Sequence, residues 1–225
     1  MPRQSFDRQI HHLQDEVLLL GSMVEQALVQ SVELLKRRDI PASRRLLDDD
    51  RLVNEKRFAI ENNILILIAT QQPIAHDLRL LAAVLEVITE LERIGDYAKG
   101  IAKVTIRLED SEVPIPIREL TRMAEMASGM LHRALGAFVT ENVPLAYSIP
   151  AEDSQVDDLY LEIYRTLIKT MIAQPELIDQ TNLLLWVDHN LERAADRVTN
   201  ICERTVFIAT GELLEMDVTD GEDTE

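Results

Sequence analysis

Cysteine and aromatic residues are scarce in this sequence. Its 225 residues include one Cys, one Trp, four Phe and four Tyr. A single Cys excludes an internal disulfide framework and a metal site built from cysteines. No uninterrupted run approaches the roughly 18–20 apolar residues that a membrane span needs, and even Ile64 to Ala69, among the longest, is far too short. The first residues also lack the apolar stretch of a secretion signal. These absences predict a cytoplasmic protein with no direct membrane insertion.

Positive charge is also in short supply. The chain carries 23 Lys and Arg against 40 Asp and Glu, a net charge of −17. So acidic a chain repels phosphate backbones, which argues against nucleic-acid binding. None of the five His has an acid three residues earlier, as the Glu-x-x-His pattern of di-iron bundles requires. Gly-rich phosphate loops, Rossmann turns and Ser/His/Asp arrangements are absent as well, so the sequence predicts no enzyme.

Long stretches separate the seven Gly and eight Pro, and within them apolar residues recur every three to four positions. This spacing predicts an all-α protein. The six expected long helices cover about 5–37, 41–70, 74–108, 117–141, 144–173 and 176–211. The polar, proline-interrupted stretch 109–116 is the best linker candidate. We expect Trp186 and Cys202 in the core, and residues 213–225 as a disordered acidic tail without apolar residues that pack.

The chain repeats itself. Residue numbers that differ by 103 align Met23 with Met126, and after a small deletion a difference of 100 aligns residues 91–96 (Leu-Glu-Arg-Ile-Gly-Asp) with 191–196 (Leu-Glu-Arg-Ala-Ala-Asp). The period is too long for a helical solenoid. Two matched halves of three helices predict two pseudo-repeated antiparallel three-helix bundles, over residues 1–110 and 111–212.

A Glu-x-x-x-Asp motif in each half is the most informative chemistry. Spacing of i, i+4 places both acids on one helix face, at the edge of an apolar stripe. Antiparallel hairpins that turn near Pro73 and Pro175 bring oxygen-bearing side chains of the preceding helix level with each motif. The predicted metal-ligand sets are Asp50, Asn54, Glu92 and Asp96 in the first half, and Asp153, Asp157, Asp188, Glu192 and Asp196 in the second.

Carboxylates this close cannot all stay ionised cheaply, because like charges raise one another's pKa. A divalent or trivalent cation would resolve the conflict, since hard cations prefer carboxylate oxygen. Iron or zinc ions are the first expectation and magnesium the alternative. A solvated acidic edge with ordinary helix salt bridges is the competing interpretation, and a metal-storage protein or metal-dependent carboxylate enzyme would use the same side chains. Repetition of the pattern in both halves favours metal binding.

Residues 71–79 (Gln-Gln-Pro-Ile-Ala-His-Asp-Leu-Arg), followed by 90–96 (Glu-Leu-Glu-Arg-Ile-Gly-Asp), resemble the signature of the PhoU family. Residues 191–196 and 200–203 are similar to that family's second copy, and the resemblance covers about 5–212. It implies two pseudo-symmetric bundles with surface metal clusters. Asn54 stands where the family has an acid, which implies a weaker first site.

The resemblance also implies a function. PhoU proteins are negative regulators of phosphate uptake and of the phosphate-starvation response. The expected protein is a cytoplasmic, non-enzymatic signalling adaptor between the ATPase subunit of the phosphate ABC transporter and a phosphate-sensing histidine kinase. Some family members dimerise, so a homodimer is a further expectation. Regulation of a sodium-coupled phosphate carrier is the alternative.

Overall fold

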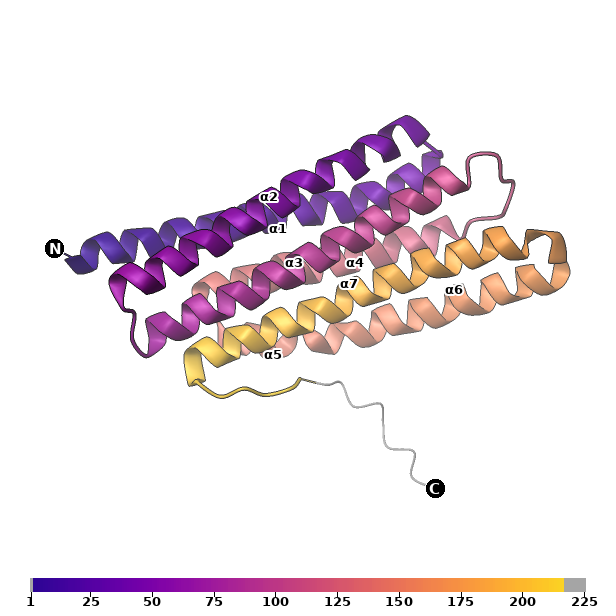
Figure 1. Ribbon diagram of the computed structural model, residues 1–225. Coiled ribbons are helices and arrows are strands. Elements are labelled where there is room, and N and C mark those ends of the chain that lie inside the picture. The colour runs from indigo at the N-terminus through magenta and orange to yellow at the C-terminus, as the bar shows by residue number, and fades with distance from the viewer. Residues whose placement is uncertain (1, 217–225) are drawn as a thin grey trace, which may run out of the picture.

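The computed structural model describes residues 2–216 (Figure 1), with side chains from residue 4 onward. Seven α-helices lie in this part of the chain: α1 Pro2–Arg37, α2 Ile40–Gln71, α3 His76–Arg107, α4 Ile117–Thr140, α5 Val143–Ser148, α6 Asp153–Ala173 and α7 Ile178–Thr210. Single 3-10 turns, Pro150–Glu152 and Pro175–Leu177, precede α6 and α7. No strand occurs between residues 2 and 216.

The helices form two three-helix bundles that lie side by side (Figure 1). We call α1–α3 the first half and α4–α7 the second half. Between the halves, α3 packs along α7 and α1 packs along α4. Residues Glu90 and Arg193 on these central helices contact Arg197 and Tyr97, respectively, so α3 and α7 run antiparallel. The all-α fold of two pseudo-repeated bundles predicted from the sequence is confirmed.

The helix predicted over 144–173 is interrupted, and the expectation of one continuous helix is wrong. The short α5 ends at Ser148, a 3-10 turn follows, and α6 begins at Asp153. Pro150 explains the break, because it has no backbone N–H and its ring clashes with the preceding turn of a helix. The equivalent position in the first half is Leu47, and α2 is unbroken there. This break places Asp153 in the first turn of α6.

Equivalent capping residues begin the second helix of each half. Asp39 accepts a hydrogen bond from the N–H of Ala42 at 2.9 Å, and Asn142 accepts one from Leu145 at 3.1 Å. Both caps satisfy a backbone donor that the helix itself leaves unpaired. The repeat detected in the sequence therefore extends to the local signals that start the helices.

Apolar side chains of α1 are largely buried between the halves. Leu20, Val24 and Leu28 are almost fully shielded from solvent. By length and composition, the segment Gln4–Arg37 could also cross a membrane, with a mean hydropathy of 1.3 over its most apolar window, of which 44% is buried. The search for uninterrupted apolar runs missed this window. Packing against α3 and α4 accounts for its apolar character.

The core contains Cys202, as predicted, but not Trp186. Cys202 is fully buried, and burial raises the pKa of its thiol to about 12. Trp186 is 53% exposed on α7, where its ring stacks on His189 with centroids 6.0 Å apart. The expectation that the single Trp belongs to the core is therefore wrong. Ile178, in the first turn of α7, is exposed as well.

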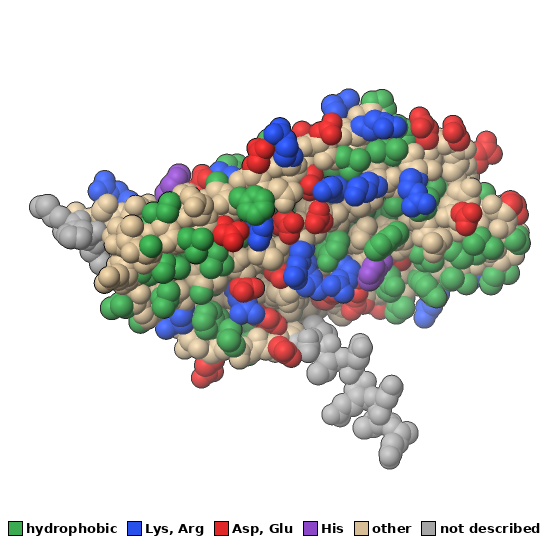
Figure 2. Space-filling view, viewed as in Figure 1, with side chains coloured by type: hydrophobic (Ala, Val, Ile, Leu, Met, Phe, Trp, Pro, Cys, Tyr) green, Lys and Arg blue, Asp and Glu red, His purple; other side chains and the backbone are tan. Residues whose placement is uncertain are grey.

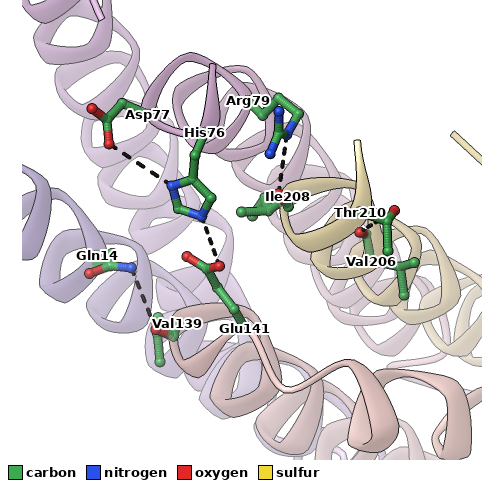
Figure 3. A network of polar contacts seen from close by, with 9 residues as sticks. All are labelled: Gln14, His76, Asp77, Arg79, Val139, Glu141, Val206, Ile208 and Thr210. Atoms are coloured by element: carbon green, nitrogen blue, oxygen red, sulfur yellow. Dashed lines mark hydrogen bonds and ion pairs between the residues drawn. The ribbon is translucent and has the colours of Figure 1, made fainter. Parts of the chain in front are cut away.

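Polar contacts join the two halves at one end of the molecule (Figure 3). The His76 ring, at the start of α3, lies with Nε2 2.8 Å from Oε2 of Glu141 at the end of α4. Close by, Arg79 donates from Nε to the carbonyl of Ile208 at 3.1 Å, near the end of α7. Since the last carbonyls of a helix lack intrahelical partners, this contact also caps α7. These contacts fix the start of α3 against the second half.

The described residues beyond α7 lie against the bundle. Gly211 ends α7 in the left-handed conformation with φ +82°, and the side chains of Leu214 and Met216 pack on the core. The N–H of Met216 donates to Oε1 of Glu203 at 2.8 Å. The predicted tail over 213–225 thus begins with residues that do pack, contrary to the expectation. Residues 217–225 of that tail lie outside the described residues.

Candidate metal centre

Five acids of the second half line one surface pocket. One is Glu203, and we call the other four the second cluster: Asp153, Asp157, Glu192 and Asp196. Two come from α6 and two from α7. The antiparallel register predicts that these side chains lie close together, because α6 leads into the hairpin at Pro175 and α7 leads back out of it. The pocket also contains side chains of Tyr160, Thr199 and Arg197. The oxygen-bearing side chains are therefore together, while their role as metal ligands stays a prediction.

Like charge and burial make this cluster costly when it is fully ionised. Burial, with the charges of Asp157 and Asp196, raises the pKa of Asp153 to about 7. Burial, with the neighbouring acids and against the opposing charge of Arg193, raises the pKa of Glu192 to about 7. One oxygen of each, Oδ1 of Asp153 and Oε2 of Glu192, is buried without a hydrogen-bond partner. The second cluster thus holds carboxylates that lack compensation.

Asp188 does not line this pocket but lies behind it. Its side chain is fully buried, and neither carboxylate oxygen has a hydrogen-bond partner. Burial, followed by the charge of Glu192 one turn later on α7, raises the pKa of Asp188 to about 8. The charges of Asp188 and Glu192 add to burial in raising the pKa of Tyr160. Sequence reasoning placed Asp188 at the edge with the other acids, and the structure instead closes it off from solvent.

Basic side chains near the second cluster are directed toward partners on α3. Arg193 hydrogen-bonds Tyr97, which is the main cause of the raised pKa of its guanidinium, and its Nε lies 3.9 Å from Oδ2 of Asp196. Arg197 places Nη1 3.5 Å from Oε2 of the buried Glu90. Both arginines therefore connect the halves, and they leave the charge of the second cluster only partly offset.

The first half presents a different arrangement. Lys99 Nζ donates to Oδ2 of Asp50 at 2.6 Å and to Oδ1 of Asp96 at 3.4 Å. Asn54 Nδ2 donates to the same Oδ2 of Asp50 at 3.2 Å. Glu92 is half-buried one turn before Asp96 on α3. We call Asp50, Asn54, Glu92 and Asp96 the first cluster. Two of its acids share the ammonium of Lys99, and the hydrogen bond that Lys99 donates to Asp50 is the main cause of the raised pKa of that lysine.

The two clusters differ in how well they suit a metal ion. In the second, an all-oxygen donor set with unpartnered buried oxygens fits a hard cation. In the first, an ammonium already lies between two of the expected ligands, and the residues do not fit. As the side chains stand, no three His, Cys, Asp or Glu residues within the described part of the chain form a ligand group for one ion. Binding would therefore require the acids of the second cluster to close around it.

Sequence reasoning missed two residues beside the clusters, Lys99 and Thr199. The alignment that pairs Glu92 with Glu192 also pairs Lys99 with Thr199, three residues beyond each aspartate of the motif. Spacing of i, i+3 places these side chains beside that aspartate on the helix face. Extending the alignment of the two motifs by one helical turn would have shown that the ammonium of Lys99 is replaced by the hydroxyl of Thr199.

The surface around the clusters is chemically mixed. Figure 2 shows acidic and basic side chains intermingled over the middle of the bundles, with apolar side chains gathered toward both ends. Ile74 at the α2–α3 turn is 72% exposed, and Ile172 near the α6–α7 turn is 76% exposed. The fold and these clusters define a class: an all-α protein of two three-helix repeats, each with carboxylates at the middle of its last hairpin.

Comparison with known proteins assigns this class. The PhoU domain matches residues 17–105 and 120–205, and the chain belongs to the PhoU family. A relative from Clostridium acetobutylicum, called a phosphate-specific transport system accessory protein PhoU homolog, is 33% identical over 218 residues, which are 96% of this chain and 100% of the relative. A homologue of the same description from Methanothermobacter thermautotrophicus is 30% identical over 94% of this chain and 97% of its own.

Two solved structures are also similar to this chain. The crystal structure of the phosphate transport system regulatory protein PhoU from Streptococcus pneumoniae has a TM-score of 0.87 at 31% identity, covering 93% of this chain and 99% of that one. The crystal structure of PhoU from Pseudomonas aeruginosa has a TM-score of 0.86 at 28% identity, covering 92% of this chain and 100% of its own.

Proposed function

We propose that this chain is a non-enzymatic accessory protein of phosphate transport that restrains phosphate uptake and the phosphate-starvation response. Membership of the PhoU family over both repeats carries the proposal, since relatives of nearly equal length are called phosphate-specific transport system accessory proteins. Its partners would be the ATPase subunit of the phosphate ABC transporter and a phosphate-sensing histidine kinase, met in the cytoplasm.

The surface supports a role in docking. Exposed apolar side chains gather at the ends of the two last hairpins, with Ile74 and Leu78 in the first half and Ile172 and Ile178 in the second. Apolar side chains exposed in groups are a feature of protein-interaction surfaces. Because the two groups lie at opposite ends of the bundles, one chain could contact two partners at once. A second copy of the chain is the other occupant that such surfaces would admit.

The second cluster supports metal binding as part of this function. Iron, zinc or magnesium would be held by Asp153, Asp157, Glu192 and Asp196. The buried oxygens of Asp153 and Glu192 that accept no hydrogen bond favour a cation there. The cation would neutralise the cluster and fix α6 against α7, the hairpin that presents Ile172 and Ile178. A docking surface held rigid in this way loses less conformational entropy when a partner binds.

A complementation and co-purification experiment tests the proposal. In cells that lack the gene, we expect phosphate-starvation reporters to be active in plentiful phosphate and the wild-type gene to silence them. The affinity-tagged protein should co-purify with the transporter ATPase and with the kinase from detergent-solubilised membranes. The double variant Ile74→Glu/Leu78→Glu should lose one of these partners, because charges on an apolar contact are costly to desolvate.

The control changes exposed positions outside the apolar groups. Lys103→Glu and Thr166→Glu should retain both partners and silence the reporter as the wild type does. Capture of neither partner by the wild-type protein would contradict the adaptor role. Capture of a sodium-coupled phosphate carrier alone would show that the protein regulates that carrier and not the ABC transporter. Phosphatase or oxidase turnover that disappears in Glu192→Ala would instead make the chain a metal-dependent enzyme.

A further inference from the structure

We infer that the two halves neutralise their carboxylates with different cations: the ammonium of Lys99 serves the first cluster, and an external metal ion is taken only by the second. The residue three positions after the motif aspartate, Lys99 or Thr199, decides between the two. The second part of this inference rests on the metal binding proposed above, whereas the assignment of Lys99 does not.

The contacts in the first half resemble those of a bound cation. Nζ of Lys99 reaches one oxygen from each helix of the hairpin, Oδ2 of Asp50 on α2 and Oδ1 of Asp96 on α3. The Asp50 side chain is 10% exposed and that of Lys99 28%, so the closer pair is shielded from bulk water. Shielding strengthens the attraction between opposite charges. The ammonium therefore links α2 to α3 at the height where the second half would need a metal.

Asn54 completes this difference between the clusters. It donates from Nδ2 to Oδ2 of Asp50 and also to the Asp50 carbonyl, at 3.2 and 3.1 Å. Its counterpart Asp157 brings another carboxylate to the pocket instead of an amide donor. The first cluster thus has three carboxylates and an ammonium, and the second has four carboxylates. A metal ion entering the first cluster would have to displace a lysine that carries the same sign of charge.

The second half has a hydroxyl where the first half has the ammonium. Thr199 lines the pocket in place of Lys99. The nearest guanidinium groups, of Arg193 and Arg197, are engaged with Tyr97 and Glu90 across the interface between the halves, and they offset the charge of Asp196 only in part. His189 lies with Nδ1 3.4 Å from Oε2 of Glu192, yet that oxygen accepts no hydrogen bond. The second cluster is therefore the one that still requires a cation.

Exchange of the two deciding residues tests the inference. Lys99→Thr gives the first cluster the hydroxyl of the second, and Thr199→Lys gives the second cluster the lysine of the first. The control variants are Lys103→Thr, an exposed lysine one turn beyond Lys99, and Thr166→Lys, an exposed threonine of α6. All proteins are stripped with EDTA and then dialysed against zinc chloride, and bound zinc is measured by elemental analysis. Melting temperatures are measured before zinc is added.

In the metal-free proteins, Thr199→Lys should melt about 2–4 °C above wild type, because an ammonium joins uncompensated carboxylates. Lys99→Thr should melt about 2–4 °C below it, because two acids lose their shared cation. After dialysis, Lys99→Thr should hold about twice the zinc of wild type, and Thr199→Lys should hold less than about a fifth. The control variants should match wild type in both measurements.

The melting temperatures decide the role of Lys99 independently of any metal. Unchanged melting of both Lys99→Thr and Thr199→Lys would overturn the inference, as would equal zinc uptake by Lys99→Thr and a wild type that does bind zinc. A wild type that takes up no zinc, with the melting shifts as expected, would contradict the proposed metal site and leave Lys99 as the internal cation of the first half.

Discussion

Replacement of Arg38 by Met is expected to lower the free energy of unfolding by about 2–4 kcal/mol, since hydrogen bonds from a charged group contribute about 1.5–3 kcal/mol each and part is recovered by water. Arg38 follows α1, and its guanidinium donates to three carbonyls of the connection between the halves. These are Leu108 at 2.9 Å, Ser111 at a short distance, and Val113 at 3.2 Å. The variant leaves these carbonyls without their donor.

Methionine is the suitable replacement because Arg38 has φ +51°. A change to glycine would relieve this left-handed backbone and hide part of the loss. The matched control is Arg37→Met, since Arg37 is exposed and pairs with Glu33 on its own helix. That variant should unfold close to the wild type, because an exposed ion pair contributes little. Urea unfolding measures both, and proteolysis should newly cleave between residues 108 and 116 in Arg38→Met. Equal stability of the two variants would show that Arg38 does not hold the connection.

This arginine also illustrates where sequence reasoning stopped. Stretch 109–116 reads as a linker from its composition, and it does join the halves without a helix. The residues of this stretch do not indicate that Arg38, about seventy positions earlier, donates hydrogen bonds to backbone carbonyls of the connection. Backbone acceptors are the same in every residue, so a sequence carries no pattern for them. Contacts of a side chain with a distant backbone therefore have to be seen in the fold.

The helices and the repeat were predictable because they depend on periodic, local signals. Apolar spacing, the caps Asp39 and Asn142, and the internal alignment all act within one or two helical turns. The helix break at Pro150 was also predictable from the sequence. The expectation of a continuous helix over 144–173 was wrong because it gave apolar periodicity more weight than a proline. The prediction that Trp186 is buried was wrong for another reason. Burial depends on which helix faces are covered by neighbouring helices, and the face of α7 that carries Trp186 is left exposed.

The candidate site also has one part that the sequence predicts and one part that it does not. Antiparallel register sufficed to bring Asp153 and Asp157 to Glu192 and Asp196, because it depends only on where the hairpin turns. Whether each carboxylate has a counter-charge depends on single side chains, such as Lys99, that fall outside the motif. The symmetric expectation for both halves followed from the motif alone, and the asymmetry follows from its neighbours.

In the metal-free protein, we expect the free energy of unfolding to fall by about 3 kcal/mol as the pH rises from 5 to 8, an amount discounted for partial exposure of the groups. Three acids of the second half have raised pKa values in the folded state: Asp153 and Glu192 at about 7, and Asp188 at about 8. In the unfolded chain such acids titrate near pH 4. Between these values the folded protein binds more protons than the unfolded chain.

The sign follows from that difference in bound protons. Stability from these groups is fully present below the unfolded pKa and is lost as the pH rises through the folded values of about 7 and 8. Urea unfolding at pH 5, 6, 7 and 8 in EDTA measures the slope. A metal ion that binds the carboxylates should reverse it, because the cation stabilises the ionised form.

Asp188→Asn isolates the group with the largest burial. Both oxygens of Asp188 lack partners, so a neutral amide of the same shape avoids a buried charge at pH 8. We expect this variant to be about 1–3 kcal/mol more stable than wild type at pH 8, and nearly equal to it at pH 5, where Asp188 is protonated. Asp158→Asn, an exposed acid of α6, should follow the wild-type curve. If Asp188→Asn were the less stable protein at pH 8, Asp188 would be ionised and compensated in the fold, and the buried acid would have a structural partner rather than a raised pKa.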